Sequence, residues 1–183
     1  MLKFQLGDNL SFDELVRRFK QPLTNFICRF ISNYDECLDI VQQAFINVYD
    51  NKNKYKSTFK FSTWLYTIAS NLAKTHLHKN KRFKLFSSYV YKTDDMEINI
   101  DFPINETSPE ESVDKNIKSA IIQKCLNKLP VKMKEFIIFR DIMELSYDEI
   151  SKITKTSKGT VKSRINRGRL LLKKYLEIYN KEF

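Results

Sequence analysis

The stretch 146–164 constrains the fold most, because it predicts two short helices joined by a tight turn. Ser146 and Glu149 stand three residues apart, the spacing of a capping box, in which each side chain accepts a hydrogen bond from the other residue's backbone amide. Residues 154–156 are polar and short enough to form the turn, and Ser157 is a good N-cap for a new helix. The pattern therefore predicts a capped helix, a turn and a second capped helix in direct succession.

The second helix of this pair has one apolar face and several basic ones. Small and apolar residues recur on it at intervals of three and four: Val161, Ile165, Gly168 and Leu172. Polar and cationic residues occupy the other sides: Lys162, Ser163, Asn166, Arg167 and Arg169. An inward apolar face and an outward basic face, after a capped partner helix, are typical of a helix-turn-helix that binds the DNA major groove. The alternative is an ordinary amphipathic helix with solvated lysines, which the agreement of caps, turn and cations disfavours.

Composition favours a mostly helical chain. Only three glycines and four prolines occur among 183 residues, too few for the many turns of a β fold. A hydrophobic share of 42% is sufficient for real cores, so global disorder is not expected.

Cysteines and histidines give no sign of a metal site. Cys28, Cys37 and Cys125 are odd in number and form no Cys-x-x-Cys pair, and the two histidines, His76 and His78, lie elsewhere. We therefore expect reduced thiols, no metal and no cofactor. No apolar run approaches the length of a membrane span, and the first residues lack the apolar centre of a signal peptide, so we expect a cytoplasmic protein.

Charge is distributed in blocks along the chain. Residues 51–93 hold 10 basic and no acidic side chains, and residues 115–183 hold 17 basic and 7 acidic ones. Between them, residues 94–114 hold 8 acidic side chains and no basic one. Two cationic regions separated by an acidic segment indicate two polyanion-binding surfaces.

Hydrophobic periodicity divides the chain in the same way. Helical spacing of apolar residues runs from about residue 11 to 84 and resumes near residue 115, whereas it disappears between them in favour of acids and prolines. We predict an all-α protein with two small helical domains, residues 1–88 and 115–183, joined by an extended acidic linker, residues 89–114.

The first block predicts three helices. A second capping box at Ser11 predicts the start of the first helix, and Pro22 predicts a kink or break within it. The second helix is expected to begin near Asp35, where acidic residues suit the positive end of a helix. Ser62 is the expected cap of the third.

The segment 51–84 mixes lysines with aromatic side chains. Lysines neutralise phosphates, and aromatic faces stack on exposed bases whatever their identity, so the mixture suits single-stranded or locally opened DNA. Phe59 and Trp64 fit a core position equally well. Tyr66 and Asn71 fall off the predicted buried stripe, which favours a polar or base-facing role for both.

Several motifs resemble those of bacterial sigma factors in the group named for extracytoplasmic function. Residues 61–72, Phe-Ser-Thr-Trp-Leu-Tyr-Thr-Ile-Ala-Ser-Asn-Leu, are similar to the region 2 signature of that family. Residues 39–45 resemble the preceding polymerase-binding helix. Residues 129–130, Leu-Pro, followed by 145–150 and 159–164, resemble region 4. Two independent motifs in the family's order make the resemblance specific, and it covers most of the chain.

The resemblance implies a transcription initiation factor that binds core RNA polymerase, recognises the −35 and −10 promoter elements and melts the −10 element. The polymerase partners it implies are the β′ clamp helices and the β flap, with the clamp-helix contacts at Asp39, Gln42 and Gln43. The residues it implies at the −10 element are Lys56, Lys60, Trp64, Tyr66, Asn71, Lys79, Lys81 and Arg82. Those it implies at the −35 element are Lys158, Thr160, Lys162, Ser163, Arg164, Asn166 and Arg167.

Further partners follow from the same resemblance. Promoter DNA is the expected polyanion, and an anti-sigma factor, membrane-bound for many relatives, is an expected protein partner. No small-molecule substrate is expected. The acidic linker is expected to pass through the RNA channel of the polymerase, where its charge imitates nucleic acid.

Three residues depart from the family's pattern. Lys155 occupies a turn position where glycine is usual, so we expect a left-handed lysine at modest strain. Thr75 and His78 stand where an aspartate and an arginine are common. These departures affect fine base preferences and leave the class unchanged.

Two other functions compete with this interpretation. A free-standing helix-turn-helix regulator, acting without polymerase, explains residues 146–174 but leaves the Trp64 block without a purpose. An enzyme such as a recombinase needs a nucleophile or a carboxylate set in the first block, and residues 51–93 contain no acid at all. The spacing of residues singles out no catalytic set, so we expect a protein that is not an enzyme.

Overall fold

The computed structural model of the chain contains two compact helical units. The structure describes residues 1–90 and 109–179, and it places side chains for 1–80 and 118–179. Every regular element in these ranges is a helix, which confirms the predicted all-α class.

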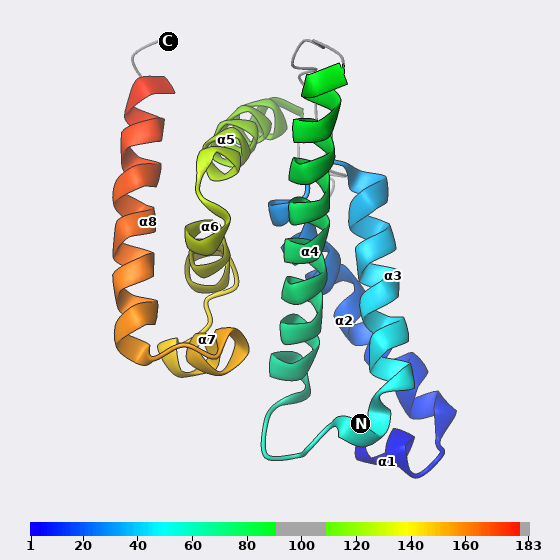
Figure 1. The fold of residues 1–183 in the computed structure, drawn as a ribbon. Helices are drawn as coiled ribbons and strands as arrows, with labels where there is room; N and C mark the ends of the chain where they lie inside the picture. Colours follow the sequence, from blue (N-terminus) through cyan, green and yellow to red (C-terminus); the bar gives the residue numbers. More distant parts are fainter. Residues whose placement is uncertain (91–108, 180–183) are drawn as a thin grey trace. The chain divides into compact units, whose positions relative to one another are not determined.

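The first unit, Met1–Asn99, is built on three long helices that pack against one another. Its elements are α1 (Leu2–Gln5), α2 (Asn9–Phe30), α3 (Tyr34–Asp50), the 3-10 helix η1 (Lys52–Lys54) and α4 (Phe61–Val90). Figure 1 shows α2, α3 and α4 side by side, with α1 close to η1. The core between the three long helices is apolar, and its buried residues include Leu23, Phe26, Ile27, Phe30, Val41, Ala44, Val48, Leu65, Ala69 and Ala73.

Helix α2 begins earlier than predicted and runs through its proline. Asp8 is the N-cap, and its carboxylate accepts a hydrogen bond from the Ser11 amide at 3.3 Å, so the predicted cap at Ser11 is wrong. Pro22 lies inside the helix and does not break it. Proline removes one backbone hydrogen bond there. Leu23 and Phe26, which follow it, are fully buried, and their packing offsets that loss.

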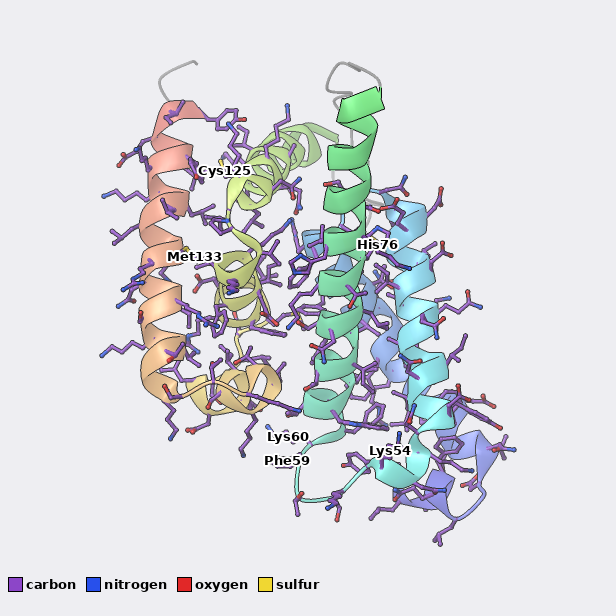
Figure 2. The ribbon with its side chains drawn as sticks, viewed as in Figure 1. Lys54, Phe59, Lys60, His76, Cys125 and Met133 are labelled. Carbon is purple, nitrogen blue, oxygen red and sulfur yellow. The ribbon has the colours of Figure 1, made fainter. Side chains whose placement is uncertain are left out.

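Helix α3 begins where the sequence predicted. Asn33 is its N-cap and accepts a hydrogen bond from the Glu36 amide at 3.1 Å, while Asp35 and Glu36 occupy the first turn. The Glu36 carboxylate also lies 2.9 Å from Nε2 of His76 on α4, which links the two helices (Figure 2). These contacts fix the start of α3 beside the middle of α4.

The second unit, Ile100–Phe183, packs its helices around the last one. Its elements are α5 (Pro109–Lys128), α6 (Val131–Ile137), the π-helix η2 (Ile138–Ile142), α7 (Tyr147–Thr154) and α8 (Lys158–Tyr179). In Figure 1, α8 runs along α6, and α7 lies across the start of α8. The buried apolar residues of this unit include Leu126, Phe136, Ile137, Ile138, Phe139, Ile150, Ile153, Val161 and Ile165.

The predicted linker, residues 89–114, is partly helical. Helix α5 begins at Pro109, so residues 109–114 belong to it, and residues 89–90 belong to α4. Proline at the first helical position, with Glu110 and Glu111 in the first turn, suits a helix N-terminus. Residues 91–108, which carry the rest of the predicted linker, lie outside the described residues.

Helices α6 and α8 approach closely at a glycine. A Cβ atom on Gly168 would lie 2.8 Å from Cγ1 of Ile137 and 3.6 Å from Cβ of Met133, the α6 residue labelled in Figure 2. Only a residue without a side chain leaves room for this contact. The prediction that Gly168 belongs to the inner face of α8 is confirmed.

Candidate nucleic-acid interface

The turn between α7 and α8 has the caps and the backbone that the sequence predicted. The Glu149 amide donates to Ser146 Oγ at 3.2 Å, and the Ser146 amide donates to the Glu149 carboxylate at 3.1 Å, which completes the capping box. Lys155 adopts the left-handed conformation, with φ 52° and ψ 40°. Ser157 Oγ accepts from the Thr160 amide at 3.2 Å and caps α8. The point at which α8 begins is therefore set by residues close to it in sequence.

The outer face of α8 exposes four of the seven residues predicted to contact the −35 element: Lys158, Lys162, Asn166 and Arg167. Lys162 and Asn166 lie one turn apart on this face. Lys158 Nζ forms an ion pair with Asp148 on α7 at 2.5 Å, so part of its charge is balanced within the motif. The exposed set combines cations for phosphates with an amide and a guanidinium that suit base edges.

The other three predicted residues of this helix, Thr160, Ser163 and Arg164, are half-buried. The Thr160 hydroxyl lies 2.9 Å from Ser157 Oγ, within the cap of the helix. The Arg164 guanidinium lies over the ring of Phe136, 5.0 Å from its centroid. This packing restricts the reach of Arg164, and the same side chain also covers part of the apolar core.

Arg169, which follows on α8, is tied to the rest of the unit. Its Nε donates to the Asp141 carboxylate at 3.1 Å, and its second guanidinium nitrogen also pairs with that carboxylate. This bidentate hydrogen bonding raises the pKa of Arg169. Arg169 therefore braces α8 against η2.

The residues predicted at the −10 element lie in two places, the loop 55–60 and helix α4. Four of the eight are exposed: Lys56, Lys60, Asn71 and Lys79. Figure 2 shows Lys60 and Phe59 together at the start of α4. Trp64 is half-buried in the first turn. Lys81 and Arg82 belong to α4, but their side chains lie outside those that the structure describes.

Tyr66 lies in the core, so the prediction that it falls off the buried stripe is wrong. Its side chain is only 5% exposed and packs edge-on against Phe26, with ring centroids 5.2 Å apart. Burial raises its pKa to about 12, because the charged phenolate is disfavoured away from water. Helix α4 packs against both α2 and α3, so its buried surface is wider than a single stripe.

An aromatic cluster supports the loop that precedes α4. The rings of Tyr55, Phe61 and Trp64 have centroids 5.4 to 6.3 Å apart. The Tyr55 hydroxyl donates to the Phe59 carbonyl at 2.8 Å, which closes the loop on itself. Phe59 is 48% exposed. Helix α4 begins at Phe61, so Ser62 lies inside its first turn and is not the predicted cap.

The three residues predicted to contact polymerase, Asp39, Gln42 and Gln43, are all exposed on α3. Beside them a groove of about 520 Å³ lies between α2 and α3, and Gln42 forms part of its lining. The other lining residues are mostly apolar: Phe12, Val16, Lys20, Leu38, Val41, Phe45, Ile46, Tyr49 and Asp50. Ile46 and Tyr49 are 43% and 45% exposed. This apolar part was not predicted from the sequence, although both residues continue the Gln42 face at spacings of four and seven.

Helix α1 was also missed, because no local pattern marks it. Phe4 is fully buried and stacks on Phe12, with centroids 4.8 Å apart. Gln5 Nε2 donates to the backbone carbonyls of Lys52 and Tyr55, at 2.7 and 3.0 Å. These contacts join the start of the chain to the loop before α4.

Metal and membrane features can be stated only for the described part of the chain. Among those side chains, no group of three His, Cys, Asp or Glu residues is placed to hold a metal ion. Cys28, Cys37 and Cys125 are buried thiols, and the Cys37 thiol donates to the Ile31 carbonyl at 3.4 Å. Within the described ranges, no helix has the length and apolar character needed to cross a bilayer.

Two family models match this chain, one in each unit. The model for Sigma-70 region 2 matches residues 15–83, and the model for Sigma-70 region 4 matches residues 119–172. The ECF RNA polymerase sigma factor SigW of Bacillus subtilis is 36% identical over 170 residues, which cover 93% of this chain and 91% of that protein. The RNA polymerase sigma-H factor of Pseudomonas aeruginosa is 31% identical over 176 residues, 96% of this chain and 91% of that one.

Solved structures share the fold. The sigma factor RpoE from Bartonella quintana, solved in complex with the anti-sigma factor NepR, aligns with a TM-score of 0.71 at 23% identity, covering 92% of this chain and 98% of that one. CnrH, solved in complex with the cytosolic domain of CnrY, aligns with a TM-score of 0.66 at 20% identity, covering 94% of this chain and 91% of that one.

Proposed function

Because the chain belongs to the extracytoplasmic function group of the sigma-70 family, we propose that its two units read the two elements of a promoter for core RNA polymerase. The protein is a transcription initiation factor that associates with polymerase. The observation that carries the proposal is the exposure of cations and base-reading side chains on both α4 and α8, one helix in each unit.

Helix α8 is proposed to enter the major groove at the −35 element. Lys162 supplies a cation for phosphates, and its contact fixes the register of the helix without reading sequence. Asn166 offers an amide whose geometry suits adenine, and an arginine such as Arg167 suits guanine. The stacked Arg164 is proposed to contact the backbone at the edge of the groove, because Phe136 holds it in place.

The loop 55–60 and helix α4 are proposed to take the −10 element. Opening the duplex and turning one base out of the stack costs a few kcal/mol, which new stacking and hydrogen bonds must offset. Exposed Phe59 and half-buried Trp64 offer aromatic surface for stacking. Exposed Asn71 is proposed to read a base edge, and Lys79, Lys81 and Arg82 are proposed to hold phosphates.

The exposed face of α3 is proposed to dock on the β′ clamp helices of the polymerase. Asp39, Gln42 and Gln43 supply polar contacts, and the neighbouring apolar groove supplies surface to bury. The second unit is proposed to contact the β flap. Neither unit then needs to bind DNA tightly alone, because tethering both to polymerase makes the second DNA contact intramolecular.

An anti-sigma protein, anchored in a membrane, is the proposed regulator. The solved relatives with this fold are complexes of a sigma factor with NepR and with the cytosolic domain of CnrY, which supports a partner of this class. We propose that the protein works in the cytoplasm, where polymerase and DNA are, and that it performs no chemistry of its own. The acidic segment 94–114 is proposed to occupy the RNA channel during initiation.

Reconstituted transcription tests the proposal. Transcript starts are mapped after overexpression, and DNA containing them is transcribed by core polymerase with the purified protein. Gln42→Ala is expected to weaken polymerase binding, Lys162→Ala to weaken duplex binding upstream, and Asn71→Ala to weaken opening. Strong binding of the protein alone to duplex operators, without polymerase association, would instead support the free-standing regulator.

A further inference from the structure

The apolar face of helix α1 packs against the first unit. Phe4 is fully buried, stacked on Phe12 and tilted against Tyr49, whose ring centroid lies 5.3 Å away. Lys52 Nζ lies over the Phe4 ring, 4.6 Å from its centroid. This packing holds the α1 backbone in place, so that the next side chain, Gln5, is directed at η1.

Gln5 joins two backbone carbonyls at the start of the loop. Its single side-chain nitrogen donates to the Lys52 carbonyl at 2.7 Å and to the Tyr55 carbonyl at 3.0 Å. A terminal amide carries two N–H groups, so one side chain satisfies both acceptors. Lys52 is the first residue of η1, and Tyr55 is its C-cap. A hydrogen bond to both carbonyls therefore fixes the direction in which the chain leaves η1.

The loop beyond this point depends on Tyr55. The Tyr55 hydroxyl donates to the Phe59 carbonyl at 2.8 Å, and its ring lies 5.4 Å from that of Trp64. A continuous series of contacts thus runs from Gln5 through Tyr55 to Phe59. The loop 55–60 contains no helix or strand of its own, so these contacts, together with the backbone hydrogen bond from the Phe59 amide to the Lys56 carbonyl at 3.4 Å, support its shape.

The region 2 family model does not extend to Gln5. The region 2 model matches residues 15–83, and α1 lies outside that range. None of the polymerase or promoter contacts proposed above involves α1. Its hydrogen bonds nevertheless end on the loop that is proposed to receive the −10 element.

We propose that Gln5 is a positioning residue, which holds the loop 55–60 in the shape that accepts opened −10 DNA. This inference rests on the proposed function of that loop. Gln5 itself touches no DNA; it acts through the carbonyls of Lys52 and Tyr55. A loop ordered before binding loses less conformational entropy when DNA arrives, so its affinity is higher than that of the same loop left free.

Trp64 provides a test that needs no DNA, because it is the only tryptophan in the chain and it contacts Tyr55. Gln5→Met keeps the length of the side chain and removes both donors. Acrylamide quenching of Trp64 fluorescence is expected to increase in Gln5→Met. It is expected to stay at the wild-type level in Gln21→Met, where an exposed glutamine on α2 bonds only Asn25. Equal quenching in Gln5→Met and wild type overturns the proposal.

A second measurement tests the consequence for DNA. Protein assembled with core polymerase is titrated with a single-stranded non-template oligonucleotide carrying the −10 element of a mapped promoter. In Gln5→Met the loop must be ordered when DNA binds, and an ordering cost similar to the net contribution of one hydrogen bond predicts roughly tenfold weaker binding. Affinity for core polymerase is expected to match that of Gln21→Met. Gln5→Glu, which has the same shape but no donor at neutral pH, is expected to behave like Gln5→Met.

The variant Asn71→Ala separates this inference from the proposed function. If Asn71→Ala weakens oligonucleotide binding and Gln5→Met does not, the positioning role of Gln5 is wrong. If Asn71→Ala has no effect but Gln5→Met still weakens binding and exposes Trp64, the positioning role stands and the assignment of Asn71 is wrong. Equal loss of polymerase binding and oligonucleotide binding in Gln5→Met indicates general unfolding and overturns the proposal.

Discussion

The two proposed DNA-binding surfaces are both basic, but they are supported in different ways. The start of helix α8 is set by neighbours in sequence, namely the Ser157 cap, the left-handed Lys155 and the capping box of α7, although the helix also packs on α6. The loop 55–60 is supported by Gln5, which lies 47 and 50 residues from the carbonyls that it bonds. A regular helix presents side chains at fixed spacing and suits duplex DNA, whereas an irregular loop can form a pocket for an extruded base.

The two helices also differ in how much of their surface is buried. Helix α8 buries one stripe, which includes Val161, Ile165 and Gly168. Helix α4 packs against both α2 and α3 and buries Tyr66 and Ser70 in addition to Leu65. The outward face of α4 is consequently narrow. The following predictions test this contrast, beginning with the largest expected effect.

The burial of Tyr66 predicts a loss of stability at high pH. Its pKa is about 12 in the folded protein and about 10 in an unfolded chain, so between these values the unfolded state binds fewer protons. The contribution of Tyr66 to the free energy of unfolding is complete below pH 10 and is lost as the pH rises to 12. The total loss is about 2–3 kcal/mol, of which about half has occurred by pH 11. Urea unfolding at pH 8 and pH 11 is expected to show a smaller pH dependence in Tyr66→Phe than in wild type.

Tyr34 is the matched control for this titration, because it is exposed on α3. Tyr34→Phe is expected to retain the wild-type loss of stability between the two pH values. If Tyr66→Phe and Tyr34→Phe lose the same stability on alkalinisation, α4 is not buried on two sides.

The close approach of α6 and α8 predicts the next largest effect. In Gly168→Ala the new Cβ would lie 2.8 Å from Cγ1 of Ile137, a core side chain that has little room to move. Overpacking of this kind typically costs more than the helix gains from alanine, and we expect a net loss of about 1–2 kcal/mol. Gly159→Ala is the control, because its new Cβ would meet only Ser157 Oγ, at 4.0 Å. Chemical denaturation giving equal stability for the two variants would contradict the packing.

Features that depend on nearby residues were predicted from the sequence, whereas features that depend on distant residues were not. The caps at Ser146 and Ser157 were predicted, because each depends on residues within four positions. The left-handed Lys155 was implied by the family resemblance, in which glycine is usual at that position. The burial of Tyr66 was not predicted, because periodicity marks the strongest apolar stripe and does not reveal that a second helix covers the neighbouring face. The contacts of Gln5 were not predicted either, because they join residues 47 and 50 positions apart that only the fold brings together.

The start of helix α2 shows that even features set by nearby residues can be predicted wrongly. Ser11 and Asp8 are both residue types favoured at N-caps, but only Ser11 has a glutamate three residues later. The structure selects Asp8, whose pKa is lowered by the hydrogen bond from the Ser11 side chain. The break predicted at Pro22 is absent from α2 for a different reason. The buried residues beyond Pro22 stabilise the helix more than the missing hydrogen bond weakens it.

The exposed cations of α8 predict a salt-dependent effect of intermediate size. Each phosphate contact releases counterions, so Lys162→Ala is expected to lower the slope of log K against log salt by about 1. Binding should weaken by a similar factor on all −35 sequences, as measured with the polymerase-bound protein on duplex fragments. Lys173→Ala is the matched control, because Lys173 lies near the end of α8 and pairs with Glu177 at 3.8 Å. A change in base preference in Lys162→Ala would contradict the assignment to phosphate.

Replacing the left-handed turn residue is predicted to have the smallest effect on stability, and to increase stability instead of lowering it. Lys155 is held at φ 52°, where a side chain is disfavoured by about 1 kcal/mol. Lys155→Gly removes this strain but gives the unfolded chain more freedom, so we expect a gain of about 0.5 kcal/mol in urea unfolding. Lys155→Ala retains a Cβ atom and is expected to gain nothing. Because the turn is determined by its own neighbours, −35 binding should be unchanged in both variants; altered binding in Lys155→Gly would show that the strain itself orients α8.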